Sequence, residues 1–109
     1  MAKVLVIDRT KWYRGQGDKE SRLLRQDGSM CCLGFDALAC GLEPDAIVNR
    51  SFPDHVAGPQ DYHDARTFRV TREIARINDT TALTDAEREA QLIPLLKQIG
   101  GYDDVQFIN

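Results

Sequence analysis

The alternation of hydrophobic and polar residues predicts a strand near each end of the chain. Residues 3–8 contain a nearly continuous apolar and β-branched run, which is typical of a strand covered on both faces. Residues 104–108 alternate apolar and polar side chains, as a half-buried strand does. We therefore expect a central N-terminal strand and a C-terminal strand that can pair with it.

Helical spacing occupies two central stretches. Residues 31–42 predict a helix that is buried nearly all round, with Asp36 as its only charged residue and Gly41 near its end. Gly34 in this helix would let another backbone approach closely, because it has no side chain. Residues 64–78 predict an amphipathic helix with an apolar face and an arginine stripe. The stripe consists of Arg66, Arg69, Arg72 and Arg76.

A capping box marks the start of the last predicted helix. The Thr84 and Glu87 side chains are spaced so that each can bond the exposed backbone amide of the other, so the helix begins at Asp85. Pro94 lacks the amide proton that an interior position needs, which predicts a kink or a restart there. The glycine pair at 100–101 is expected to end the helix.

The remaining segments are predicted to be mostly loops. Residues 8–18 form the first, residues 19–25 a short helix or strand, and residues 27–28 a turn. Residues 43–63 contain proline, glycine and both histidines, so we expect a loop with one helical turn at 44–48.

Length and composition predict one globular domain. The chain has 109 residues, of which 42% are hydrophobic and 28% charged. A chain of this length can bury one core, so residues 1–109 are expected to fold as a single unit. The predicted fold class is α+β, with a small sheet that includes the N- and C-terminal strands. This sheet would pack against the buried Cys-Cys-Leu-Gly helix and two further helices.

The chain shows no sequence feature of a membrane or secreted protein. No apolar run approaches the roughly 20 residues that cross a bilayer, and the N-terminus does not resemble a secretory signal. Its three cysteines are an odd number, and Cys31 and Cys32 are adjacent and poorly placed to pair with each other. We therefore expect reduced thiols and a cytoplasmic protein.

Charge is unevenly distributed along the chain. The net charge is −3, yet residues 9–25 contain six basic and two acidic side chains. Such a basic segment can attract phosphates or an acidic partner, although solvated surface charge is the commoner explanation. Long duplex DNA is an unfavourable partner, because the whole chain is acidic and has no recognition-helix or zinc-finger motif. Walker and dinucleotide-binding glycine motifs are also absent.

The segment 9–15 is the strongest candidate for ligand binding. Aromatic faces that can stack on a base alternate there with cations that can bind phosphates. An equally weighted alternative is that Trp12 packs in the core and the cations are solvated. The candidate ligand-binding residues are Arg9, Lys11, Trp12, Tyr13 and Arg14, with Arg69 and Arg72 added if the fold brings them close.

Cysteine chemistry is a weaker hypothesis. Cys31 and Cys32 open a predicted helix, whose dipole would lower their pKa and favour a nucleophile. Packing in a buried helix explains the same two residues without any reaction. Adjacent cysteines also do not fit the ligand spacing of structural zinc sites, so no metal or cofactor is predicted. Potential bases and orienting carboxylates are His55, His63, Asp54 and Asp64.

Several stretches resemble small uncharacterised proteins encoded in bacteriophage genomes. They are residues 6–12, residues 30–35 with 39–41, residues 77–79 and residues 85–89. The resemblance spans most of the chain and carries over no catalytic residue. It implies an accessory protein that neutralises a host component, such as a defence nuclease or the nucleotide signal that activates one.

The resulting hypothesis is a non-enzymatic phage-type binding protein in the host cytoplasm. Its sharper form is an anti-defence protein that sequesters a phosphate-bearing signalling nucleotide. Alternatives are an anti-CRISPR-like inhibitor of a host defence protein, a cysteine-dependent enzyme and an assembly protein. We also expect a homodimer, because small two-fold oligomers are common.

Overall fold

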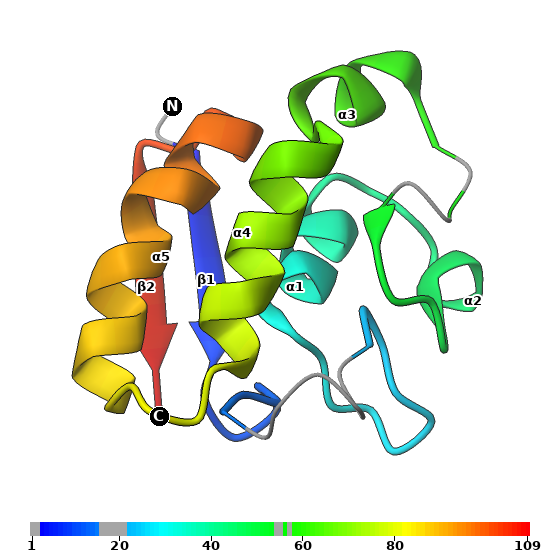
Figure 1. The fold of residues 1–109 in the computed structure, drawn as a ribbon. Helices are drawn as coiled ribbons and strands as arrows, with labels where there is room; N and C mark the ends of the chain where they lie inside the picture. Colours follow the sequence, from blue (N-terminus) through cyan, green and yellow to red (C-terminus); the bar gives the residue numbers. More distant parts are fainter. Residues whose placement is uncertain (1–2, 16–21, 54–55, 57) are drawn as a thin grey trace.

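The computed structural model describes residues 3–15, 22–53, 56 and 58–109 of the chain. In this part of the chain two strands and five helices form an α+β fold, as predicted (Figure 1). In order they are β1 (Val4–Asp8), α1 (Cys32–Ala39), α2 (Pro44–Ile47), α3 (Gln60–Ala65), α4 (Phe68–Asp79), α5 (Asp85–Gly100) and β2 (Asp104–Ile108). None of these helices has the length and apolar character needed to cross a membrane.

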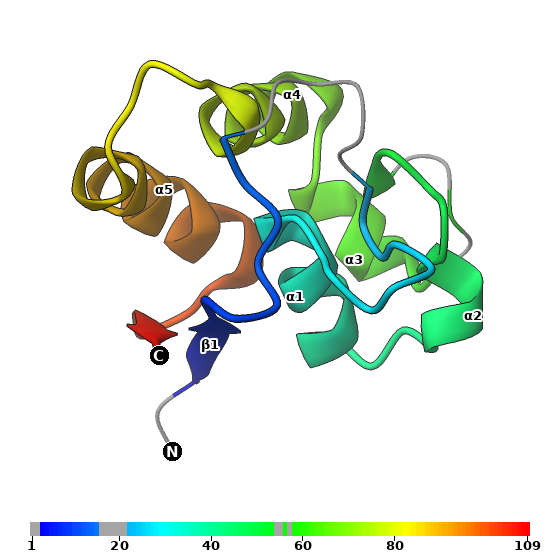
Figure 2. The ribbon, with the colours of Figure 1, turned by 90° about the horizontal axis from the view of Figure 1, so that it is seen from below.

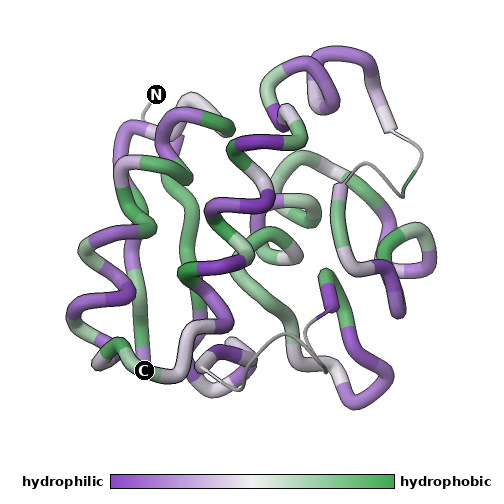
Figure 3. The backbone as a smooth tube through the Cα atoms, in the orientation of Figure 1, coloured by the Kyte–Doolittle hydropathy of each residue, from purple (hydrophilic) through white to green (hydrophobic). Residues whose placement is uncertain are grey.

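The two terminal strands pair in parallel, which confirms the predicted pairing. Their register runs from Val4 opposite Asp104 to Asp8 opposite Ile108. A parallel pair needs a long crossover, and the intervening helices supply it. In Figure 3, β1 is apolar along most of its length, whereas α4 and α5 alternate between hydrophilic and hydrophobic segments.

The prediction that β1 is central and covered on both faces is wrong. Leu5 and Ile7 are buried, but Val4 and Val6 are 38% and 45% exposed. The reason is that α1 and α5 lie on the same side of the strand pair (Figure 2). Among the described residues the sheet has only these two strands, so each strand is an edge and its outer face meets solvent.

Helix α1 is the centre of the core. It is buried on most sides, as its apolar composition predicts. A Cβ added at Gly34 would lie 1.7 Å from the carbonyl oxygen of Leu23, so the chain around Leu23 crosses the helix at the distance that only glycine permits. The predicted close backbone approach at Gly34 is confirmed.

The prediction of a single helix over residues 64–78 is wrong at its start, where the chain is divided between two helices. Helix α3 ends at Ala65 and α4 begins at Phe68, because the backbone of Thr67 is extended, with φ −64° and ψ 154°. The prolines and glycine before residue 60 predicted a loop, so α3 was not predicted. Pro59 occupies the N-cap position of this helix. The predicted single turn near Pro44 is confirmed as α2.

Arg66 is not part of the predicted arginine stripe, because it lies at the break between α3 and α4. Its guanidinium forms a buried ion pair with Asp36 of α1, with Nε to Oδ2 at 2.6 Å and Nη2 to Oδ1 at 2.7 Å. The hydroxyl of Tyr102 donates a third bond to Asp36 at 2.6 Å. These bonds satisfy a carboxylate that has no access to water. They join α1, the α3–α4 junction and the segment before β2.

Helix α5 begins and ends as the sequence predicts. Thr84 Oγ1 accepts a bond from the Glu87 amide at 3.2 Å, and the Glu87 carboxylate accepts one from the Thr84 amide at 2.9 Å. Gly101 ends the helix in the left-handed region, with φ 64°. Of the kink or restart predicted at Pro94, the restart is wrong, since the helix continues through it. Pro94 is exposed, and the buried side chains before and after it hold the helix in place.

Candidate anion-binding pocket

Trp12 is a core residue, as the packing alternative proposed. Only 4% of its surface is exposed, and its ring centroid lies 5.0 Å from that of Phe107. The guanidinium of Arg14 lies 4.5 Å from the Trp12 ring centroid. The predicted role of Trp12 as a stacking surface for a ligand is therefore wrong, because neighbouring side chains already cover the indole.

Asn78 holds the segment 9–15 against the helices. Its Oδ1 accepts bonds from Trp12 Nε1 at 2.7 Å and from the Cys32 amide at 3.0 Å. Its Nδ2 donates to the carbonyl of Tyr13 at 3.0 Å, and its own carbonyl accepts the Gly15 amide at 2.8 Å. This buried residue in the last turn of α4 was not a sequence candidate, although a polar residue following an apolar helical face is the pattern that would indicate it.

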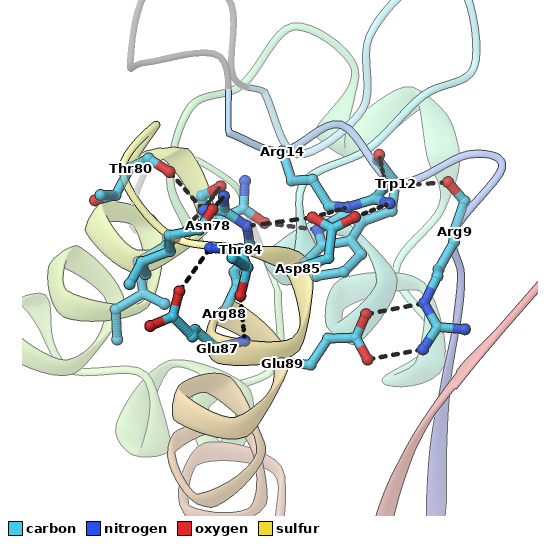
Figure 4. Close-up of polar contacts among 12 residues, drawn as sticks. Arg9, Trp12, Arg14, Asn78, Thr80, Thr84, Asp85, Glu87, Arg88 and Glu89 are labelled. Atoms are coloured by element: carbon cyan, nitrogen blue, oxygen red, sulfur yellow. Dashed lines mark hydrogen bonds and ion pairs between the residues drawn. The ribbon is translucent and has the colours of Figure 1, made fainter.

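Two of the predicted cations are paired with carboxylates of α5. Arg14 contacts Asp85 through Nε at 3.1 Å and Nη2 at 2.9 Å, and Arg9 contacts Glu89 at 2.8 and 2.7 Å (Figure 4). The Arg14 Nη1 also donates to the carbonyl of Trp12 at 2.9 Å. The basic character of this segment is thus partly neutralised by α5.

Two other predicted ligand residues lie at the edge of this arrangement. Lys11 is exposed. Tyr13 is half-buried, and the Arg25 guanidinium lies 4.2 Å from its ring centroid. Arg69 and Arg72 lie on α4, and neither lines the cavity beside Arg14.

Arg88 is a buried cation that sequence reasoning missed. Its side chain is 3% exposed, and Nη1 donates to the carbonyls of Ile77 at 2.7 Å and Thr80 at 2.7 Å (Figure 4). Guanidinium donors suit this end of α4, where the last helical carbonyls lack partners and the helix dipole is negative. Arg88 stands four residues before the buried Leu92, so its spacing could have placed it on the inner face of α5.

The Nε of Arg88 has no hydrogen-bond partner among the described residues, although it is buried. The nearest carboxylate oxygen, Asp85 Oδ1, lies 3.9 Å away. A buried donor without a partner costs about 1–3 kcal/mol of folding free energy. Such a group in a native structure calls for an explanation, and a bound ion or water is one of them.

These groups surround a cavity of about 460 Å³, which we call the Arg14–Arg88 pocket. It is lined by residues 12–15 and by Thr81, Leu83, Asp85 and Arg88. Gly15 has φ +69°, a left-handed backbone that favours glycine, and a Cβ there would lie 2.9 Å from Arg88 Nη2. Two guanidinium groups and the positive end of α5 face one carboxylate, which favours an anionic ligand.

The cysteines lack the activation that a helix N-terminus was expected to give. Burial raises the pKa of Cys31 to about 12 and raises the pKa of Cys32 well above its ordinary value. Of the candidate bases, His63 lies on α3 with its ring 5.2 Å from that of Tyr62, while His55 and Asp54 lie outside the described residues. No group of three histidine, cysteine or acidic side chains in the described ranges could hold a metal ion.

Comparison with known proteins gives no match to a family model, a curated protein or a solved structure.

Proposed function

We propose that this chain is a non-enzymatic binding protein that takes a phosphate-bearing small ligand in the Arg14–Arg88 pocket. The proposal is carried by the buried Nε of Arg88, which lacks a hydrogen-bond partner among the described residues. The cavity of about 460 Å³ also falls within the range of roughly 300–1,000 Å³ that small-molecule sites occupy.

Phosphate is the anion that suits these donors best. Guanidinium groups bind phosphate oxygens through paired hydrogen bonds, and helix N-termini add backbone donors of the same sign. Arg14 supplies paired donors at the same pocket as Arg88, and Asp85, the first residue of α5, also lines that pocket. The high pKa of the buried cysteines supports a binding function over cysteine catalysis.

Asp85 acts in this proposal as an internal competitor for the ligand. Its side chain is 54% exposed while bonded to Arg14. Arg14 bonds Asp85 through two nitrogens, but the carboxylate is open to water, so a phosphate dianion can compete with it for the same two donors. The ligand would then bond Arg14 and Arg88 together.

The bacteriophage resemblance supplies the biological form of the proposal. A small phage protein that holds a phosphate-bearing signalling nucleotide would stop that nucleotide from activating a host defence in the cytoplasm. Binding without turnover is enough for this role. Direct inhibition of a host defence protein is the alternative, and a homodimer stays a prediction.

Calorimetric titration with inorganic phosphate, and then with mono- and cyclic nucleotides, tests the site. Arg14→Ala should abolish binding, and Asp85→Asn should strengthen it because the competing charge is removed. Lys11→Ala is the matched control, since it removes one exposed cation that does not line the pocket. Equal losses in Arg14→Ala and Lys11→Ala would show a general charge effect and contradict the proposed site.

A further inference from the structure

Helix α4 begins with an aromatic side chain that faces solvent. Phe68 is 67% exposed, more than the other large hydrophobic side chains exposed in the described ranges, which are Val4, Val6 and Ile108. The hydrophobic effect favours burial of a phenyl ring. A single exposed apolar side chain is common on protein surfaces, so the groups around this ring decide what it can bind.

Arg72 lies between Phe68 and a second ring, that of Phe52. Its guanidinium carbon is 3.5 Å from the centroid of Phe52 and 4.2 Å from the centroid of Phe68. Both distances are within the range of cation–π contacts. The flat guanidinium and the two rings thus form one stack that joins α4 to the segment after α2.

Two more arginines extend this stack along α4. Residues three and four positions apart share a helix face, so Arg69 and Arg76 lie on the same side as Arg72. Arg69 is exposed and forms no hydrogen bond or ion pair within the described part of the chain. Arg76 pairs with Glu73 at 3.1 and 2.5 Å, and both side chains are largely exposed. We call Phe52, Phe68, Arg69, Arg72 and Arg76 the α4 face.

A cavity of about 490 Å³ lies beside the α4 face. Its lining includes Phe52, Arg72 and Arg76. Thr81 lines both this cavity and the Arg14–Arg88 pocket, so the two are neighbours across the end of α4. Arg14 of the first predicted arginine group lines one of these cavities, and Arg72 and Arg76 of the second group line the other.

We infer that the α4 face binds single-stranded nucleic acid. Sequence-tolerant single-strand sites combine aromatic rings, on which bases stack, with cations that follow the phosphates. Phe68 supplies an accessible ring, and Arg69 and Arg76 supply exposed cations on the same helix face, while Arg72 is held against the Phe68 ring. Duplexes are poor ligands for such a surface, because their bases are already stacked inside the helix.

This inference is independent of the proposed phosphate pocket. It depends on the exposed ring of Phe68 and on the arginines of α4, and none of these residues lines the Arg14–Arg88 pocket. A merely electrostatic surface, such as one that docks an acidic protein, would use the same arginines without needing an open aromatic face. The effect of removing the Phe68 ring therefore distinguishes a single-stranded nucleic acid from an acidic protein as the partner.

Fluorescence anisotropy with a labelled oligothymidylate of 15 nucleotides tests the inference. An abasic oligomer of the same length carries the phosphates without the bases. We expect the wild-type chain to bind oligothymidylate at low salt, at least about tenfold more tightly than the abasic oligomer, because base stacking contributes to the affinity. Phe68→Ala should lose about tenfold for oligothymidylate and leave the abasic oligomer unaffected.

Arg69→Ala and Lys11→Ala form the charge-matched pair. Arg69→Ala should weaken binding and make the dependence of log affinity on log salt shallower by about 0.7, the contribution of one single-strand phosphate contact. Lys11→Ala should leave both quantities nearly unchanged. Circular dichroism of Phe68→Ala checks that the variant is folded, which we expect because the side chain is exposed.

Two results would overturn the inference. One is the absence of oligothymidylate binding by the wild-type chain at low salt. The other is equal affinity for the two oligomers with no effect of Phe68→Ala, which would identify an electrostatic surface for an acidic partner. Phosphate binding in the Arg14–Arg88 pocket should be unchanged in Phe68→Ala, so failure of either proposal can be recognised separately.

Discussion

The indole Nε1 of Trp12 donates a buried hydrogen bond of 2.7 Å to Oδ1 of Asn78, a residue 66 positions later in the chain. The same Oδ1 accepts the amide of Cys32. One carboxamide therefore joins the loop after β1, the start of α1 and the end of α4. The walls of the Arg14–Arg88 pocket depend on this junction, because Tyr13 and Gly15 are also bonded to Asn78.

Replacing Asn78 should destabilise the fold strongly. Asn78→Ala leaves Trp12 Nε1, the Cys32 amide and the Tyr13 carbonyl without their partner, and each buried unpaired group costs about 1–3 kcal/mol. We expect a loss of at least about 3 kcal/mol in the free energy of unfolding, measured by urea titration. Gln91→Ala, an exposed change on α5, is the control and should have little effect.

The ion pair between Arg66 and Asp36 predicts a different mutational pattern. Arg66→Ala leaves a buried carboxylate without its cation and should cost about 3–5 kcal/mol in thermal or urea unfolding. The double variant Arg66→Met with Asp36→Leu should recover much of that loss, because it removes both charges. A double variant as unstable as Arg66→Ala would mean that packing, and not the uncompensated charge, explains the loss.

The contact between Arg14 and Asp85 predicts a pH effect at the pocket. The hydrogen bonds from Arg14 lower the pKa of Asp85 below its ordinary value of 3.8. A lowered folded-state pKa contributes stability above the unfolded pKa, and that stability is lost as pH falls through the folded pKa. Carboxyl resonances followed by NMR should show a higher Asp85 pKa in Arg14→Ala than in the wild-type chain.

The same contact should be visible in acid unfolding. The stability of the wild-type chain is expected to fall more steeply below about pH 4 than that of Arg14→Ala, which has already lost the interaction. Parallel acid unfolding curves for the two proteins would contradict the assignment. Glu73→Gln changes a carboxylate remote from Arg14 and should preserve the difference between the wild-type and Arg14→Ala backgrounds.

Thiol labelling distinguishes the three cysteines. Burial raises the pKa of Cys31 to about 12 and that of Cys32 well above its ordinary value, so neither should react at neutral pH while the protein is folded. Cys40 is only partly buried, although burial raises its pKa as well. Mass spectrometry after brief iodoacetamide treatment should find Cys40 modified first. Fast labelling of Cys31 or Cys32 would restore the cysteine-enzyme alternative.

Local patterns were sufficient for much of the fold. The apolar run located β1, the alternation located β2, the capping box located the start of α5, and the glycine pair located its end. Gly34 likewise indicated a close backbone approach, because it has no side chain. Each of these features depends on residues within a few positions of one another, so periodicity and capping chemistry can identify it in one sequence.

The partners of the polar side chains depended on the folded chain. Arg66 fitted an exposed stripe by spacing but pairs with Asp36, 30 positions earlier, and Trp12 fitted a ligand platform but bonds Asn78. No sequence pattern distinguishes Arg88 from the other charged residues, yet it lines the candidate pocket. A side chain's spacing indicates which face of its own element it occupies. Its burial and hydrogen-bond partner depend on which distant element packs against that face, and a single sequence carries no local pattern for that.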